Sequence, residues 1–102
     1  MSAKTFKDFK AASETAAAST RIQELTAEQT GLVESARWTA ARIAEIKSAP
    51  GYKPPRKKED SDGGVGNYEA QLEANFNRRV EIVKTLRKLG NKAARDPDII
   101  VD

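Results

Sequence analysis

Between Ile22 and Ile46, hydrophobic residues recur every three or four positions, which is the spacing of one face of an α-helix. From Ile22 onward the steps alternate between three and four, as they do along the seam of a coiled coil, so one partner helix is enough to cover them. The seam is polar at Gln29 and Thr39. Its members are Ile22, Leu25, Gln29, Leu32, Ala36, Thr39, Ile43 and Ile46.

Helix-start signals occur twice in the first helix that this pattern predicts. Thr5 is followed three positions later by Asp8, and Thr26 is followed three positions later by Gln29, which has the form of a capping box. The first helix therefore either runs through without interruption, or breaks near residue 25 and restarts. Both alternatives are compatible with the hydrophobic spacing.

Residues 50–66 are rich in proline and glycine and indicate a connector between two helices. Within it a basic cluster runs directly into an acidic one, so the charges nearly cancel. We interpret the connector first as a solvated strap; an arm lying on a neighbouring subunit and a phosphate-binding patch are the alternatives. Its charged residues are Lys53, Arg56, Lys57, Lys58, Glu59, Asp60 and Asp62.

A second amphipathic pattern follows in residues 67–95. Asn67 can cap the start of this helix, and Gly90 with Asn91 can cap its end. The predicted apolar stripe consists of Tyr68, Leu72, Phe76, Val83, Leu86 and Leu89, with Ile82 on its flank.

These elements predict an all-α fold in a single domain. It is a helical hairpin of two long helices, the first either continuous or broken once, joined by a Pro/Gly-rich connector. The N-terminal helical part spans residues 1–49, the connector 50–66, the basic amphipathic helix 67–95 and an extended C-terminal tail 96–102.

The composition excludes several kinds of chemistry. The chain has no cysteine and no histidine, which removes thiolate zinc sites and the commonest general base. No apolar run approaches the roughly 18 residues of a membrane span, and the first ten residues lack the hydrophobic stretch of a signal peptide. We expect a soluble protein, intracellular or within a particle, that is not an enzyme and has no catalytic or metal-binding residues, cofactor, small-molecule substrate or membrane partner.

Two large side chains stand out against the predicted helix faces. Trp38, the only tryptophan, falls on the polar side of the first helix, where it either packs against Phe6 and Phe9 or anchors a protein partner. Arg79 falls in the middle of the apolar stripe of the second helix. Because a buried unpaired guanidinium is costly, Arg79 must snorkel to water, pair with an acid such as Glu34, or reach a partner.

The last apolar residues of the chain can add a strand to the edge of a partner's sheet. Together with Trp38 and Arg79 they form the candidate partner-binding set. This set consists of Trp38, Arg79, Ile99, Ile100 and Val101.

The second helix is also the more basic element of a chain whose net charge is +3. Four of its positive residues share one face if the helix continues to residue 95, and such a face can lie on nucleic-acid phosphates. An ordinary solvated face is the alternative. The candidate phosphate-binding residues are Lys84, Lys88, Lys92 and Arg95.

Hydrophobic residues make up 38% of the chain, and many of them are alanine, so its own core is expected to be thin. This favours a non-enzymatic structural or adaptor subunit of a larger homo- or hetero-oligomeric assembly, such as a virion, a secretion apparatus or another multi-subunit complex. The alternative is a nucleic-acid-binding helical module that uses the basic face of the second helix.

Overall fold

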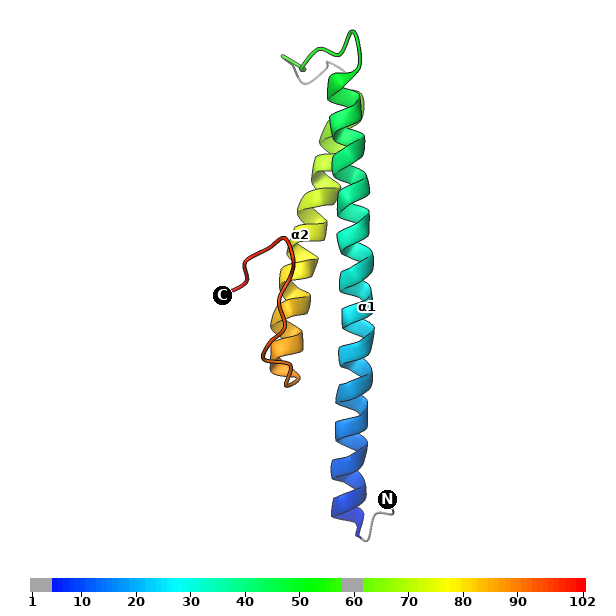
Figure 1. The fold of residues 1–102 in the computed structure, drawn as a ribbon, viewed down its shortest axis with the longest axis vertical. Helices are drawn as coiled ribbons and strands as arrows, with labels where there is room; N and C mark the ends of the chain where they lie inside the picture. Colours follow the sequence, from blue (N-terminus) through cyan, green and yellow to red (C-terminus); the bar gives the residue numbers. More distant parts are fainter. Residues whose placement is uncertain (1–4, 58–61) are drawn as a thin grey trace.

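The computed structural model describes residues 5–57 and 62–102, and it contains helices α1 (Phe6–Ser48) and α2 (Val65–Lys88). The two helices lie side by side and antiparallel (Figure 1). The molecule measures 72 × 21 × 20 Å, because α1 has 43 residues and α2 has only 24. The predicted all-α helical hairpin is confirmed.

Helix α1 is continuous, so the break predicted as one alternative near residue 25 does not occur. At its start the Thr5 side chain accepts a hydrogen bond from the Asp8 backbone N–H (3.2 Å), as the sequence indicates. Thr26 does not cap a second helix. Its hydroxyl donates to the carbonyl oxygen of Ile22 (2.8 Å), which is how a threonine is accommodated inside a helix.

Helix α2 begins two residues before Asn67, so the predicted cap at that residue is wrong. The Asp62 carboxylate supplies the cap instead, accepting hydrogen bonds from the backbone N–H groups of Gly64 (2.9 Å) and Gly66 (2.8 Å). A side chain at position 66 would collide with that carboxylate. Within the connector, Lys58, Glu59 and Asp60 lie outside the described residues.

The end of α2 corrects a second boundary, since the helix stops at Lys88 and not at residue 95. Gly90 has a φ of 111° and its N–H donates to the Arg87 carbonyl (3.2 Å), while the Asn91 N–H donates to that of Leu86 (3.0 Å). These two bonds form a Schellman motif, which reverses the chain direction. The predicted cap at Gly90 and Asn91 is confirmed.

All eight predicted seam positions of α1 are buried or half-buried. The facing side of α2 has the same alternation of three and four, but it passes through two polar residues that the predicted stripe left out. Phe76, which the stripe included, is 50% exposed. This three-four face of α2, continued by Leu89 just after the helix, consists of Val65, Tyr68, Leu72, Asn75, Arg79, Ile82, Leu86 and Leu89. Val83 of the predicted stripe lies beside it and is fully buried.

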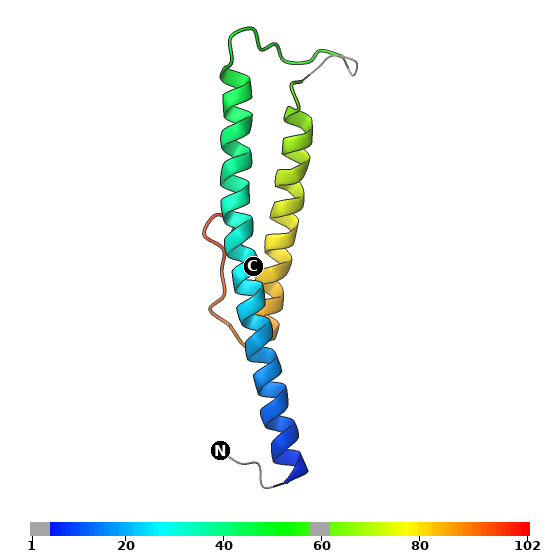
Figure 2. The ribbon, with the colours of Figure 1, turned by 90° about the vertical axis from the view of Figure 1, so that its right-hand side faces the viewer.

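The hydrophobic core lies where α1, α2 and the tail meet, and it contains Leu25, Ile82, Val83, Leu86 and Ala94. Beyond it, residues 6–20 of α1 extend past the end of α2 as a single helix (Figures 1 and 2). We call this part the N-terminal segment. Its residues are exposed except for a half-buried Ala18. Neither helix is long and apolar enough to cross a membrane.

Candidate functional site

The most elaborate polar site of the described chain is centred on Arg79, which is almost completely buried between the helices and the tail. Its Nε donates to Oδ2 of Asp96 (2.8 Å), and its Nη2 donates to the other oxygen of the same carboxylate. Nη2 also reaches Oδ2 of Asp98 (2.9 Å). One cation on α2 therefore binds two carboxylates of the tail.

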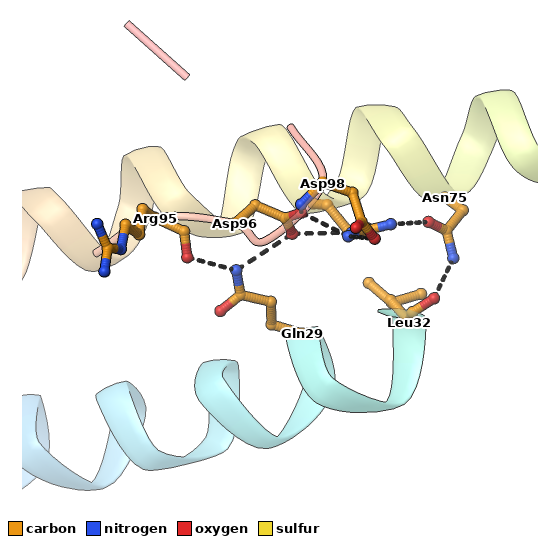
Figure 3. A network of polar contacts seen from close by, with 7 residues as sticks. Gln29, Leu32, Asn75, Arg95, Asp96 and Asp98 are labelled. Carbon is orange, nitrogen blue, oxygen red and sulfur yellow. Dashed lines mark hydrogen bonds and ion pairs between the residues drawn. The ribbon is translucent and has the colours of Figure 1, made fainter. Parts of the chain in front are cut away.

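Two amides connect this group to α1, as Figure 3 shows. The Asn75 amide accepts from Arg79 through Oδ1 (3.4 Å) and donates through Nδ2 to the carbonyl oxygen of Leu32 (2.7 Å). The Nε2 of Gln29 donates to Oδ2 of Asp96 (3.2 Å) and to the carbonyl oxygen of Arg95 (3.0 Å). The network thus joins α1, α2 and the tail by directional bonds.

The electrostatics of the network favour the charged form of both partners. Burial alone would raise the pKa of Asp96, but hydrogen bonds from Arg79, from the Asp98 backbone N–H and from Gln29 outweigh it, and the pKa is lowered. The hydrogen bond to Asp96 raises the pKa of Arg79. The pair is therefore ionised at neutral pH.

A second arginine holds the far part of the tail. Arg87 donates from Nε to the carbonyl oxygen of Ala94 (3.1 Å) and from Nη1 to that of Val101 (2.9 Å). Of the predicted partner-binding residues in the tail, Val101 packs against the core and Ile99 is half-buried. Ile100 is exposed and remains accessible to a partner.

The prediction that Arg79 pairs with an acid is confirmed, but the acids are Asp96 and Asp98 of the tail and not Glu34, and its snorkelling to water is wrong. Sequence reasoning placed Gln29 and Arg79 on the facing sides but missed their partners, because it treated the tail that carries Asp96 and Asp98 as extended. The signal was present in the spacing: Asn75 and Arg79 continue the three-four alternation of α2, just as Gln29 does in α1. Polar residues at seam positions of two paired helices are expected to meet.

Trp38 lies on the outer side of the hairpin and is 62% exposed. Its ring meets that of Tyr68 on α2 edge to face, with centroids 6.2 Å apart and planes at 72°. The predicted alternative, packing against Phe6 and Phe9, is wrong because those residues lie about 45 Å away along the same straight helix. Trp38 therefore presents most of its surface outward.

The four candidate phosphate-binding residues are all exposed, and none forms an ion pair with the described part of the chain. Lys84 and Lys88 lie on α2. Helical spacing does not place Lys92 and Arg95 beside them, since the Schellman motif intervenes. Arg95 instead lines a shallow hollow of about 280 Å³ together with Arg37 and Pro97.

The polar network of this protein suits structure rather than acid-base chemistry, because its carboxylates are bound by guanidinium and amide groups. Within residues 5–57 and 62–102, no three acidic side chains gather as a metal site would require. Comparison of the chain with protein-family models, curated proteins and solved structures found no match. The function is therefore argued from the residues themselves.

Proposed function

We propose that the protein is a non-enzymatic structural or adaptor subunit of a larger protein assembly, such as a virion, a secretion apparatus or another multi-subunit complex. The observation that supports this proposal is the N-terminal segment. It projects beyond the hairpin with no described element packed along it (Figure 2).

An isolated helix of this length is marginal in water, because helix nucleation is costly and most helical stability in proteins comes from tertiary packing. Yet the segment carries two phenylalanines at its outer end, Phe6 and Phe9, which are 80% and 59% exposed. Burying them against a partner would supply the packing that the hairpin does not provide. A subunit whose partners complete its packing explains both features.

Trp38 supplies a second accessible anchor. Tryptophan is enriched among the residues that dominate binding at protein interfaces, and here it is presented on a rigid helix paired with α2. Exposed Ile100 adds an apolar side chain on the tail. The molecule therefore offers separate contact points along its length, as an adaptor requires.

Site-specific photo-crosslinking in the native cell tests the proposal. A photo-reactive amino acid at position 38 is expected to give discrete heavier products, whereas the same group at position 73, an exposed glutamate of α2, gives few. Trp38→Ala should reduce recovery of the same proteins from untreated cells without changing the helix content. Recovery of the chain from its cell as an uncrosslinked monomer would contradict the role.

A second candidate function, nucleic-acid binding, is favoured by the exposure of Lys84, Lys88, Lys92 and Arg95, which form no ion pair with an acid of residues 5–57 and 62–102. It predicts binding to DNA or RNA that weakens steeply with salt. The variant Lys84→Gln/Lys88→Gln should lower the salt slope by roughly 2, while the charge-matched control Lys7→Gln/Lys10→Gln leaves it unchanged. Equal effects of both variants would reject these residues as the binding site.

A further inference from the structure

We infer that the hollow between α1 and the tail binds an apolar C-terminal residue of a partner protein, with its carboxylate held between Arg37 and Arg95. The inference rests on the proposed assembly role and names the chemistry of one partner. The hollow measures about 280 Å³, roughly the volume of nine water molecules, so it fits one terminal residue of a peptide. Besides the two arginines, its lining consists of Gln29, Thr30, Val33, Glu34 and Pro97.

Two guanidinium groups that are far apart in the sequence meet at this hollow. Arg37 lies on α1, and Arg95 comes directly before the tail. Both side chains are exposed, and neither forms an ion pair within residues 5–57 and 62–102, so both can bind a ligand. The arginines that do pair with an acid there are Arg21, Arg42, Arg78 and Arg79.

The buried network fixes the backbone that carries Arg95. The Nε2 of Gln29 donates to the carbonyl oxygen of Arg95 (3.0 Å), and the next residue, Asp96, is bound by Arg79. The Arg95 guanidinium itself turns away from this network (Figure 3). Pro97 follows, and its ring restricts the backbone φ angle. The Arg95 backbone is therefore held beside α1 before a ligand arrives, which lowers the ordering cost of binding.

The charges of the lining suit a monoanion that has a hydrogen-bond donor beside it. Arg37 and Arg95 contribute two positive charges and Glu34 one negative charge, which leaves one positive charge in excess. A terminal carboxylate carries one negative charge, and each of its oxygens can accept from one guanidinium. The amide N–H of the same terminal residue can donate to Glu34. A phosphate monoester, with a charge of about −1.5 to −2, would exceed this balance.

The uncharged part of the lining suits an apolar side chain. Val33 is buried, and the ring of Pro97 adds further apolar surface to the hollow. A leucine side chain of the ligand would cover both and remove apolar surface from water. A nucleic-acid strand fits less well, because its other phosphates would come close to Glu34 and to Asp98, whose side chain is 46% exposed.

NMR titration of the full-length chain with the peptide acetyl-Gly-Gly-Leu tests the inference. Amide signals within residues 30–37 and 94–96 should shift with a dissociation constant of about 0.1–1 mM, as expected for a ligand of this size. The same peptide with a C-terminal amide keeps the side chain but lacks the charge, so its dissociation constant should be at least about tenfold higher. Equal binding of the acid and the amide would overturn the inference.

Charge-removing variants locate the site. Arg37→Gln/Arg95→Gln should raise the dissociation constant of the acid at least about tenfold, because it removes both charge-assisted contacts. The matched control Lys84→Gln/Lys88→Gln removes the same charge from residues outside the hollow and should leave the constant unchanged. Circular dichroism verifies that both variants keep the native helix content. An equal loss of affinity in the two variants would reject the hollow as the site.

An oligonucleotide of eight thymidines tests the phosphate alternative, since each of its linkages carries one negative charge. It should shift the signals of residues 30–37 only weakly. If it bound there more tightly than acetyl-Gly-Gly-Leu, the two arginines would belong to a nucleic-acid surface and the inference would be overturned.

The assembly role has a separate readout, since crosslinks from position 38 report on other proteins. Failure of acetyl-Gly-Gly-Leu to bind, with those crosslinks retained, would reject the hollow as a carboxylate site and keep the proposed function. Peptide binding by a chain that is recovered from its cell as an uncrosslinked monomer would reject the assembly role and keep the carboxylate site.

Discussion

Arg79 and Asp96 form the most deeply buried ion pair among the described residues, with side-chain exposures of 4% and 0%. They are 17 positions apart in the chain and belong to different parts of the fold, α2 and the tail. Because Asp96 also accepts from Gln29 on α1, the pair lies at the point where three segments meet. Removing this ion pair should therefore weaken both the packing of the tail and the pairing of the two helices.

The first prediction concerns this pair. Arg79→Met should lower the free energy of unfolding by about 3–5 kcal/mol, because it leaves the Asp96 carboxylate buried without a cation. Urea denaturation measures the loss. Adding Asp96→Asn should recover about 1–3 kcal/mol, since a neutral amide can still accept from Gln29 and carries no buried charge.

Arg78→Met is the control for the neighbouring position. Arg78 bonds to Glu28 of α1 (2.9 Å), but that pair is accessible to water, so a much smaller loss is expected. If Arg78→Met and Arg79→Met destabilised the protein equally, the buried network would not be the main polar support of the hairpin.

The second prediction is that the free energy of unfolding depends on pH only in the acidic range. The pKa of Asp96 is lowered in the folded state, so its contribution is complete above the ordinary value of 3.8 and is lost as the pH falls through the lower folded value. The hydrogen bond from Arg78 also lowers the pKa of Glu28, so the contribution of Glu28 to stability is likewise lost only in acid. Without histidine, stability should be nearly flat between about pH 5 and 7.

Urea midpoints measured from pH 2.5 to 7 test this dependence. The difference between the native chain and Asp96→Asn should shrink as the pH falls below about 4, because protonation removes the charge that the variant lacks. Parallel curves for the two proteins at all pH values would show that Asp96 does not titrate as the structure requires.

The third prediction compares two glycines that have open space around the missing side chain. Gly31 lies inside α1, where alanine is the better helix former, so Gly31→Ala should stabilise the protein by about 0.5–1 kcal/mol. Gly90 has a φ of 111°, which an L-residue disfavours, so Gly90→Ala should destabilise it by about 1–2 kcal/mol. Thermal unfolding followed by circular dichroism measures both, and effects of the same sign would contradict the prediction.

The sequence predicted much of this fold because local signals agree with the packing. The alternation from Ile22 to Ile46 gave the buried face of α1, and Gly90 with Asn91 gave the end of α2. The helix-start signals did not decide whether the first helix is continuous. Thr26 can either cap a helix or bond to the carbonyl four residues earlier, and only the continuous packing against α2 decides between them.

The Arg79 network could not be predicted from apolar spacing alone. Its carboxylates, Asp96 and Asp98, follow a chain reversal, and a sequence does not state where a tail returns. The N-terminal segment has the opposite difficulty: its helix was predicted correctly, but its lack of a packing partner became evident only when α2 proved to be much shorter than α1.

The fourth prediction tests whether the N-terminal segment depends on a partner. In a dilute sample, at a few micromolar, the backbone amides of residues 9–20 should exchange with deuterium almost as fast as those of an unfolded chain. Amides of residues 25–46, which are covered by α2, should exchange only at the rate of global unfolding. Hydrogen–deuterium exchange with peptide-level mass spectrometry resolves the two regions.

Adding the proteins recovered by crosslinking separates intrinsic stability of the segment from stability gained by association. Protection of residues 9–20 should then increase in the native chain and stay low in Phe6→Ala/Phe9→Ala, because mass action stabilises only the species that can bind. Strong protection in the dilute monomer would mean that the alanine-rich helix is stable without contacts. In that case the segment would need no partner, and the main support for the assembly role would be lost.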